Sequence, residues 1–402
     1  MLRKMLHELR TMPKYLYVTT ALTLFGLGIG VYRMIVGLGP TTNLSKEFPW
    51  GVWISFDLAT VALSGGAFTL AALVYVLQFE DLHAATRPTV LAGLLGYSSV
   101  MVVLLFDLGR WDRFYNVFLH PNVSSALLEV SWCITAYSLI LVYELSPVLL
   151  SKTRFKWLLP TIKKYTVPIV IAGVTLSTMH QSSLGTMFII MSPRLHPLWS
   201  SMLLPVFFLI SSLASGISLV IAGASLSYWL FGRSLKTKTM AKLSWFIPWI
   251  LAFYLVIKFG ELVITSEWDL LTTSGTYGTL FWAEIIIGCL IPIGLFASRR
   301  VRFSRSASLI GALFIIAGTI LNRFDVTWFA IAPRNGESYS PHWMEIAILV
   351  GIVAGLITVY SLVARYLPVY EETAVYKGKS KPTDLPSPTV STLPRESHAA
   401  GD

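Results

Sequence analysis

One predicted helix carries an unusual group of hydrogen-bonding side chains in its middle. Residues 177–185 read STMHQSSLG and lie within an apolar run, YTVPIVIAGVTLSTMHQSSLGTMFIIM. The imidazole of His180 can donate, accept or carry a proton near neutral pH, and the neighbouring amide of Gln181 can both donate and accept. A polar side chain that faces lipid is costly. The segment therefore predicts one wall of a polar interior that moves protons or binds a polar head group inside a membrane.

Ionisable residues recur in the other apolar segments. If successive segments cross the membrane in alternating directions, most of these charged residues lie near the same end of the helices. Asp57 follows FPWGVWISF, Glu129 lies in LLEVSWC, and Glu261 follows Lys258 in IKFGEL. Residues three apart share one face of a helix, so Lys258 and Glu261 are expected to form a structural ion pair. Glu144 is the acid of the opposite half. The charged residues at the shared end also include Asp107, Arg110, Glu284, Arg323 and Glu345.

Membrane-spanning helices are needed to position these side chains. The mean hydropathy is +0.66 and 13% of residues are charged, about half the usual fraction of a soluble protein. About 20 apolar residues cross roughly 30 Å of hydrocarbon. Ten segments are long enough: 15–39, 50–78, 88–109, 124–150, 165–190, 198–231, 243–264, 277–298, 306–324 and 342–366. We therefore predict an all-α polytopic membrane protein with about ten transmembrane helices.

The domain organisation follows from these segments. Residues 1–14 are expected to be a cytoplasmic N-terminus and residues 15–370 the transmembrane domain. Residues 371–402 are rich in Pro, Ser and Thr and have too little apolar surface to pack, which predicts a disordered cytoplasmic tail.

The net charge of +10 comes from basic residues that lie mostly on one side of the predicted helices. This distribution indicates the membrane topology and argues against a nucleic-acid-binding surface. Most of the 31 Lys and Arg residues fall on one side of the predicted helices. The other side carries Lys46, Arg110, Arg113, Arg194 and Arg334. By the positive-inside rule, both termini are cytoplasmic and the polar ends of the helices face outward. We expect a multi-pass protein of the bacterial cytoplasmic (inner) membrane whose active side is periplasmic.

Several cofactors are not expected in this chain. Cys133 and Cys289 lie far apart in different predicted helices, which excludes the spacings that hold iron–sulfur clusters or structural zinc. A haem held by two histidines would need them at matched depth on facing helices, and His180 alone lies deep within a span. We therefore expect no haem, no iron–sulfur cluster and no metal site.

An ordered set of motifs carries a family resemblance. The motifs are FPWGVWISFDL (48–58), LGR (108–110), LxEVxWC (127–133), TMHQSSLG (178–185), HPLW (196–199), KFGEL (258–262) and FWAE (281–284). Over roughly residues 15–370 the chain resembles the NrfD/PsrC family of quinone-interacting membrane subunits. TMHQSSLG and HPLW favour its HybB branch, which accompanies periplasm-facing nickel–iron hydrogenases.

The resemblance implies a haem-free protein of two four-helix bundles plus an additional helix pair. It implies electron exchange between a periplasmic ferredoxin-like iron–sulfur subunit and menaquinone or a related quinone. The large and small subunits of a nickel–iron hydrogenase would be further partners, and membrane lipid would surround the chain. Some relatives carry an acid in the inner half of the sixth helix, where this chain has Gly223, so their proton path does not transfer.

We predict a quinone pocket among the second to fifth helices near the outer face. Its candidate quinone-binding residues are Asp57, Arg110, His120, His180, Gln181, His196 and Trp199. The candidate proton-transfer residues are Asp57, Glu129, His180, Glu261 and Glu144. Quinone reduction takes two electrons and two protons, and a buried carboxylate or imidazole is suited to deliver the protons. Proton translocation from the cytoplasm, with Glu144 as a stepping stone, is a second hypothesis.

Two other functions fit parts of the pattern. Ten helices with buried acids could form a proton-coupled secondary transporter. Against this, the sequence shows no inverted repeat beyond the short similarity between HPN and HPLW. It also lacks the paired, Gly- or Pro-broken helices that transporters carry at mid-depth in the membrane. A passive anchor for a soluble enzyme would need one helix and no buried acids. Separately, the hydroxyl groups around His180 could serve helix packing alone, because small polar residues favour close contacts between membrane helices.

Overall fold

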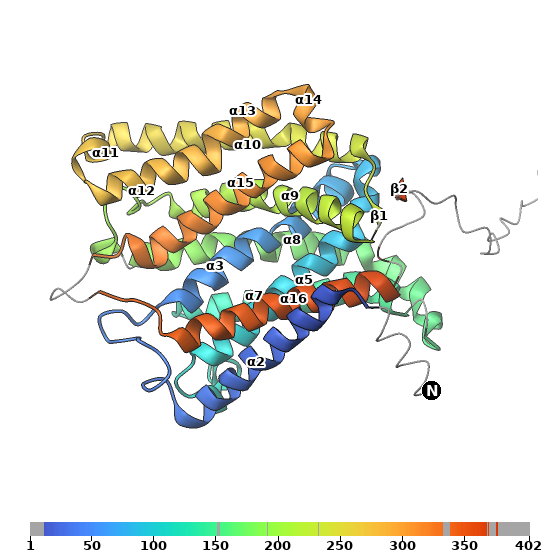
Figure 1. Ribbon diagram of the computed structural model, residues 1–402, viewed down its shortest axis with the longest axis horizontal. Helices are drawn as coiled ribbons and strands as arrows, with labels where there is room; N and C mark the ends of the chain where they lie inside the picture. Colours follow the sequence, from blue (N-terminus) through green and yellow to red (C-terminus); the bar gives the residue numbers. More distant parts are fainter. Residues whose placement is uncertain are drawn as a thin grey trace, which may run out of the picture.

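The computed structural model describes residues 12–150, 153–190, 192–231, 233–332, 338–367, 369 and 375–376. The described part is almost entirely helical (Figure 1). Its long helices are α2 (Lys14–Val36), α3 (Val52–Ser64), α5 (Thr86–Asp107), α7 (Ala126–Leu150), α8 (Leu159–Ile190), α9 (Leu204–Phe231), α10 (Thr237–Ile264), α15 (Arg305–Phe324) and α16 (Trp343–Tyr366). This arrangement confirms the prediction of an all-α fold.

The second and the eighth long helices along the chain are built from shorter pieces. The second consists of α3, α4 (Gly66–Ala71) and the π-helical turn η1 (Ala72–Val76). The eighth consists of α12 (Thr276–Ile285), η6 (Ile286–Leu290) and α13 (Ile291–Ala297). Another π-helical turn, η7 (Asp325–Phe329), continues α15. Short helices in the connections are η2 (Glu80–Ala85), η3 (Trp111–Arg113), α6 (Asn116–Leu119), η4 (Lys156–Leu158), η5 (Ser192–Arg194), α11 (Leu270–Thr273) and α14 (Arg299–Arg302).

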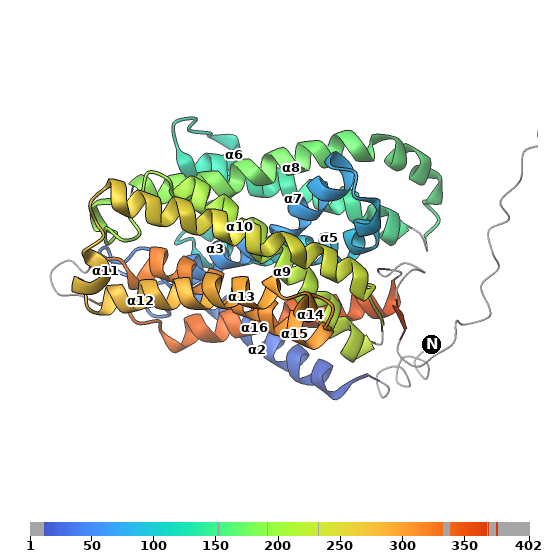
Figure 2. The ribbon, with the colours of Figure 1, turned by 90° about the horizontal axis from the view of Figure 1, so that it is seen from above.

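Nine helices in the described residues are long and apolar enough to cross a membrane. The one predicted span that is not among these nine is the fifth, 165–190, which lies within α8. Its polar middle explains why it is not among the nine, because STMHQSSLG lowers the hydropathy of any window that contains it. Nevertheless, α8 runs beside α7 and α9 (Figures 1 and 2). The polytopic membrane class is therefore confirmed.

The helices form two bundles and one outlying pair. The helix that begins with α3 packs with α5, α7 and α8 in the first bundle, whereas α9, α10, the helix that begins with α12, and α15 form the second. The pair α2 and α16 pack along each other and lie against α5 and α3 (Figure 1). This is the arrangement that the family resemblance implied.

The bundles meet closely at α4 and α9. A Cβ atom added to Gly216 would lie 2.2 Å from the backbone nitrogen of Gly66, so the two backbones approach as only glycine permits. Beside this contact, the hydroxyl of Ser215 donates to the carbonyl of Ala62 at 3.1 Å. The amide of Gln181 in α8 donates to the carbonyl of Val61 at 2.9 Å. These contacts fix α3 and α4 between α8 and α9.

Three connections interlock at one end of the molecule, namely those after α2, α8 and η7. Leu195 and Ile331 form an antiparallel β-bridge, and the guanidinium of Arg194 lies 5.6 Å from the ring centre of Phe48. Tyr339 packs its ring against Phe48, with centroids 6.3 Å apart. This end contains the predicted outer loops.

The predicted terminal segments fall mostly outside the described residues. Residues 1–11 and most of 371–402 are not described, so the cytoplasmic N-terminus and disordered tail remain predictions. Within the tail segment, β2 (Val375–Tyr376) pairs antiparallel with β1 (Arg233–Ser234). The two strands lie at the end opposite the interlocked connections (Figure 1).

Candidate functional site

A groove of about 690 Å³ lies at the N-terminal end of α7, where this helix meets α8. Its lining is mainly apolar, with the hydroxyls of Ser124 and Ser125 and the carboxylate of Glu129 as polar groups. Trp132 contributes an aromatic face. The other lining residues are Pro121, Val123, Ala126, Leu128, Cys133, Ala136 and Leu176. The groove can therefore accommodate a flat apolar ring with a few polar substituents.

Glu129 links the groove to α8. The hydroxyl of Ser183 donates to the carboxylate of Glu129 at 2.5 Å, and the carbonyl of Met179, at 2.9 Å, is the alternative acceptor for the same proton. Leu176, His180 and Ser183 are spaced four and three residues apart, so they share one face of α8. Ser183, which binds the Glu129 carboxylate, is thus one helical turn from His180 along α8.

His180 lies fully buried behind the groove. Its ring packs against Tyr97 of α5, with centroids 5.7 Å apart, and Tyr97 packs edge-on against Tyr137 of α7 at 4.9 Å. Neither imidazole nitrogen has a hydrogen-bond partner among the described residues. Its neighbour Gln181 is also fully buried. Both residues belong to the first bundle, as predicted, but neither lines the groove directly.

Asp57 lies in a second buried group, between the first bundle and the outlying helix pair. Its side chain is 3% exposed, and neither carboxylate oxygen has a hydrogen-bond partner in the part of the chain that the structure describes. Arg33 of α2 is fully buried and donates to the carbonyl of Leu108 at 2.6 Å. Asp107 lies close enough to interact electrostatically with both Asp57 and Arg33. Asp57 therefore sits apart from the groove residues.

Arg110 and His120 are exposed on the connection between α5 and α7. Arg110 forms a bidentate ion pair with Asp112, in which its Nε and Nη2 donate at 2.9 and 2.7 Å. This hydrogen bond raises the pKa of Arg110 and lowers the pKa of Asp112. Arg110 is thus engaged at the surface. His120 follows α6, next to the groove residue Pro121.

His196 and Trp199 contact the second bundle. The His196 ring stacks on Tyr277 with centroids 4.3 Å apart, and burial lowers the pKa of the imidazole. The indole of Trp199 is fully buried and donates to Glu284 at 2.9 Å. The structure therefore separates these two residues from the groove, although the prediction grouped them in a single pocket. The sequence order alone could not reveal that their loop packs over α12.

The predicted ion pair between Lys258 and Glu261 is wrong. The ammonium of Lys258 donates instead to the carbonyl of Leu198 at 3.0 Å and lies 4.8 Å from the ring centre of Phe207. Glu261 accepts a hydrogen bond from Ser201. Both partners belong to the connection before α9. Lys258 and Glu261 share one face of α10, but each forms its hydrogen bond with this connection and not with the other. An ion pair does form between Arg110 and Asp112, at 2.7 Å.

The last predicted site residue, Glu144, is half-buried in the C-terminal half of α7. It shares a face of α7 with Glu129 and Tyr137, because successive spacings of eight and seven residues return to one side. A Cβ atom added to Gly173 of α8 would lie 3.8 Å from the Glu144 carboxylate. Glu144 thus faces α8, at the opposite end of this helix pair from the groove.

Two residues important in the second bundle were not among the predicted site residues. Asn322 donates to Glu284 at 2.9 Å, and Tyr254 donates to the same carboxylate oxygen at 3.3 Å. Asn322 could have been noticed in the polar run NRFD within an otherwise apolar helix. Tyr254 lies one turn before Lys258 and gives no comparable signal.

Comparison with known proteins places the chain in a family. The family model described as "Polysulphide reductase, NrfD" matches residues 40–333. The "Probable Ni/Fe-hydrogenase 2 b-type cytochrome subunit" of Escherichia coli K12 is 34% identical over 84% of this chain and 88% of its own length. The "Menaquinone reductase, integral membrane subunit" of Nitratidesulfovibrio vulgaris Hildenborough is 32% identical over 88% and 91%. The chain therefore belongs to the NrfD family of polytopic membrane subunits, as its motifs predicted.

Proposed function

We propose that this chain is the quinone-interacting membrane subunit of a respiratory oxidoreductase and that it binds a quinone head group in the groove at α7. The single observation that carries the proposal is the position of Glu129, which faces an apolar groove on one side and is hydrogen-bonded to Ser183 on the other. The name of the menaquinone reductase relative supports menaquinone or a related quinone as the substrate.

The groove residues divide into those that hold a ring and those that bind its oxygens. Trp132 and the aliphatic side chains offer apolar contact. Ser124 and Ser125 can donate to a carbonyl oxygen, and Glu129 can exchange a proton with it. His120 and Pro121 lie where the connection reaches the groove. Of the predicted binding residues, His120 is therefore retained near the ring, whereas His180 and Gln181 act from behind it.

Proton supply can follow the contacts between α7 and α8. A proton that leaves Glu129 for the quinone is replaced through the Ser183 hydroxyl, which both donates and accepts. His180, one turn away on the same face, is the next group that can carry a proton. The chain thus supplies protons, while electrons come from a redox partner.

The partner is proposed to dock on the connection between α5 and α7, above the groove. This connection exposes large apolar side chains, including Phe114 at 55% and Leu119 at 65%. Exposed apolar surface of this kind marks a contact with protein or membrane. A periplasmic ferredoxin-like iron–sulfur subunit is our candidate, and the hydrogenase relative supports nickel–iron hydrogenase subunits as further members of the complex.

A haem does not fit the described residues, although one relative is named a b-type cytochrome subunit. His180 is the histidine that lies within a long helix, and its buried ring packs against Tyr97. The other described histidines are His83, His120, His196 and His342, and all lie outside the long helices. We therefore maintain that quinone is bound without haem, which an absorption spectrum of the purified complex would test.

Replacement of Glu129 by Gln tests the proposal. The Glu129→Gln variant retains the size of the side chain but cannot deliver a proton, so we expect donor-driven menaquinone reduction to fall by about 10²-fold or more. The half-buried Glu267 on the same side of the molecule, in the variant Glu267→Gln, is the matched control and should retain turnover. Unchanged turnover in Glu129→Gln would contradict the proposal.

Coupling to proton translocation is a second part of the proposal. Glu144, Tyr137 and Glu129 share the face of α7 that meets α8, and this alignment supports a path from the cytoplasmic half. Complexes in proteoliposomes should then build a membrane potential during quinone reduction, and Glu144→Gln should lower it. A wild-type complex that turns over without any potential would rule out coupling.

The competing function is a proton-coupled secondary transporter. The buried acids of the second bundle fit that class, but a transporter would have no need of iron–sulfur partners. Gentle detergent extraction distinguishes the two, because a quinone subunit should co-purify with extractable quinone and with iron–sulfur subunits. Isolation of the chain alone, without quinone, would favour the transporter.

A further inference from the structure

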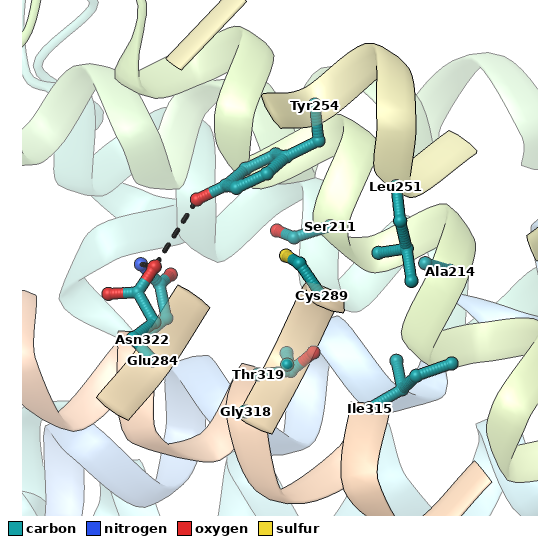
Figure 3. Close-up of a pocket in the computed structure, with 11 residues that line it drawn as sticks. Ser211, Ala214, Leu251, Tyr254, Glu284, Cys289, Ile315, Gly318, Thr319 and Asn322 are labelled. Atoms are coloured by element: carbon teal, nitrogen blue, oxygen red, sulfur yellow. Dashed lines mark hydrogen bonds between the residues drawn. The ribbon is translucent and has the colours of Figure 1, made fainter. Parts of the chain in front are cut away.

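A small cavity of about 20 Å³ lies inside the second bundle, where α9, α10, α15 and the helix from α12 meet (Figure 3). A cavity of at least about 10–15 Å³ can hold one water molecule when two or more polar groups are available. The lining includes five side chains with oxygen or nitrogen atoms, namely Ser211, Tyr254, Glu284, Thr319 and Asn322. The site is separate from the quinone groove, since no lining residue is shared.

The carboxylate of Glu284 is the anionic group of this cavity. Its Oε1 accepts from Tyr254 at 3.3 Å and from Asn322 at 2.9 Å, and its Oε2 accepts from Trp199 at 2.9 Å. A carboxylate has about four acceptor positions. Three neutral donors therefore leave one position for a further hydrogen bond.

Asn322 connects this carboxylate to a buried cation. Its side-chain oxygen accepts from the guanidinium of Arg323, while its nitrogen donates to Glu284. Arg323 also donates to the hydroxyl of Ser211 at 2.8 Å, and it lies 3.7 Å from the ring centre of Phe208. The amide thus separates a negative group from a positive one within a bundle that excludes bulk water.

Thr319 supplies a polar group on the other side of the cavity. Its hydroxyl makes no hydrogen bond with the described part of the chain, although threonines in these helices commonly donate to a carbonyl one turn back. Next to it, Gly318 and Gly288 bring α15 and η6 into contact, because a Cβ atom on Gly318 would lie 2.1 Å from the Cα atom of Gly288. The close crossing holds Thr319 at the cavity.

We propose that the cavity binds one water molecule, which donates to Glu284 and bonds to the hydroxyl of Thr319, and that this water makes Glu284 a proton-exchanging group of the second bundle. The water supplies the fourth hydrogen bond of the carboxylate and a partner for Thr319. It also provides a mobile O–H group for proton exchange beside the phenol of Tyr254, whereas the indole of Trp199 and the amide of Asn322 do not relay protons. The site does not depend on quinone binding in the first bundle.

Infrared difference spectroscopy of the intact complex tests the site. Spectra recorded on reduction and reoxidation in ordinary and in ¹⁸O-labelled water should show an isotope-shifted O–H band from an internal water. The band should be lost in Glu284→Gln and in Thr319→Val, the second of which preserves side-chain shape. It should persist in Ser218→Ala, a buried serine of α9 that bonds to Ala214 and lies outside the cavity.

Glu129→Gln separates this proposal from the proposed function. That variant should lose quinone reduction but retain the water band when spectra are induced by a pH jump instead of by turnover. A wild-type complex without an isotope-shifted band would overturn the water site, as would a band that survives in Thr319→Val. The carboxylic-acid band of Glu284 is the one present in wild type and absent in Glu284→Gln. If the water band is present but exchange into ²H₂O shifts no such carboxylic-acid band, proton exchange by Glu284 is refuted.

Discussion

The hydroxyl of Ser183 in α8 donates a hydrogen bond to the carboxylate of Glu129 in α7, at 2.5 Å. The bond joins a groove that can accept a flat ring to a helix face that carries a buried imidazole. A carboxylate at the edge of a membrane helix is costly unless it has a partner or a function. Ser183 is the partner, and proton delivery is the proposed function.

Removal of this hydrogen bond should slow quinone reduction without abolishing it. A hydrogen bond to a charged group contributes about 1.5–3 kcal/mol, so Ser183→Ala should lower turnover by roughly tenfold to a hundredfold. Steady-state assays with a menaquinone analogue would measure it. Ser182→Ala, on the neighbouring position, is the control and should behave as wild type. Equal rates in Ser183→Ala and wild type would show that the contact is structural.

Replacement of His180 by Leu should affect activity more than stability. Neither imidazole nitrogen has a hydrogen-bond partner within the described ranges, so Leu removes no bond seen there, and apolar swaps of similar volume cost less than about 1.5 kcal/mol. We expect thermal unfolding in detergent to change little while quinone turnover falls at least about tenfold, the lower range for loss of an acid–base group. A variant that is unstable but fully active per folded molecule would assign His180 to packing.

The pH dependence of stability should include a contribution from His196. Burial lowers the pKa of this imidazole, so the unfolded chain binds a proton more readily than the folded one between the two pKa values. The folded state is therefore favoured above the unfolded pKa of about 6.5 and loses this contribution as the pH falls. Between about pH 7.5 and pH 5.5, which bracket that pKa, the melting temperature should fall more in wild type than in His196→Gln. Identical pH profiles would contradict this prediction.

The topology predicts opposite labelling of two exposed threonines. Thr273 follows α10 at the proposed periplasmic end, and Thr153 follows α7 at the proposed cytoplasmic end. In intact spheroplasts, a membrane-impermeant thiol reagent should label Thr273→Cys and spare Thr153→Cys. The native Cys133 and Cys289 are buried and should contribute little background. Labelling of Thr153→Cys alone would invert the orientation.

The sequence by itself determined the membrane class, the helices and the importance of several polar positions. Apolar runs of 20 or more residues are local properties, and so is the presence of Glu129 or His180 within them. The burial of Asp57, His180 and Gln181 followed from the cost of exposing polar groups to lipid. Family motifs then indicated two bundles and an outlying pair, which the helix packing confirms.

The tertiary structure alone decided which polar residues meet. Lys258 and Glu261 share a helix face, yet both bind the loop before α9. The carbonyl of Leu198 is the acceptor for Lys258, and the hydroxyl of Ser201 is the donor to Glu261. Trp199 reaches Glu284, 85 residues away, and Glu129 reaches Ser183, 54 residues away. Such pairings depend on how α7, α8, α9 and α12 cross. Helical periodicity fixes the face of a side chain but leaves its neighbour to the packing of the other helices.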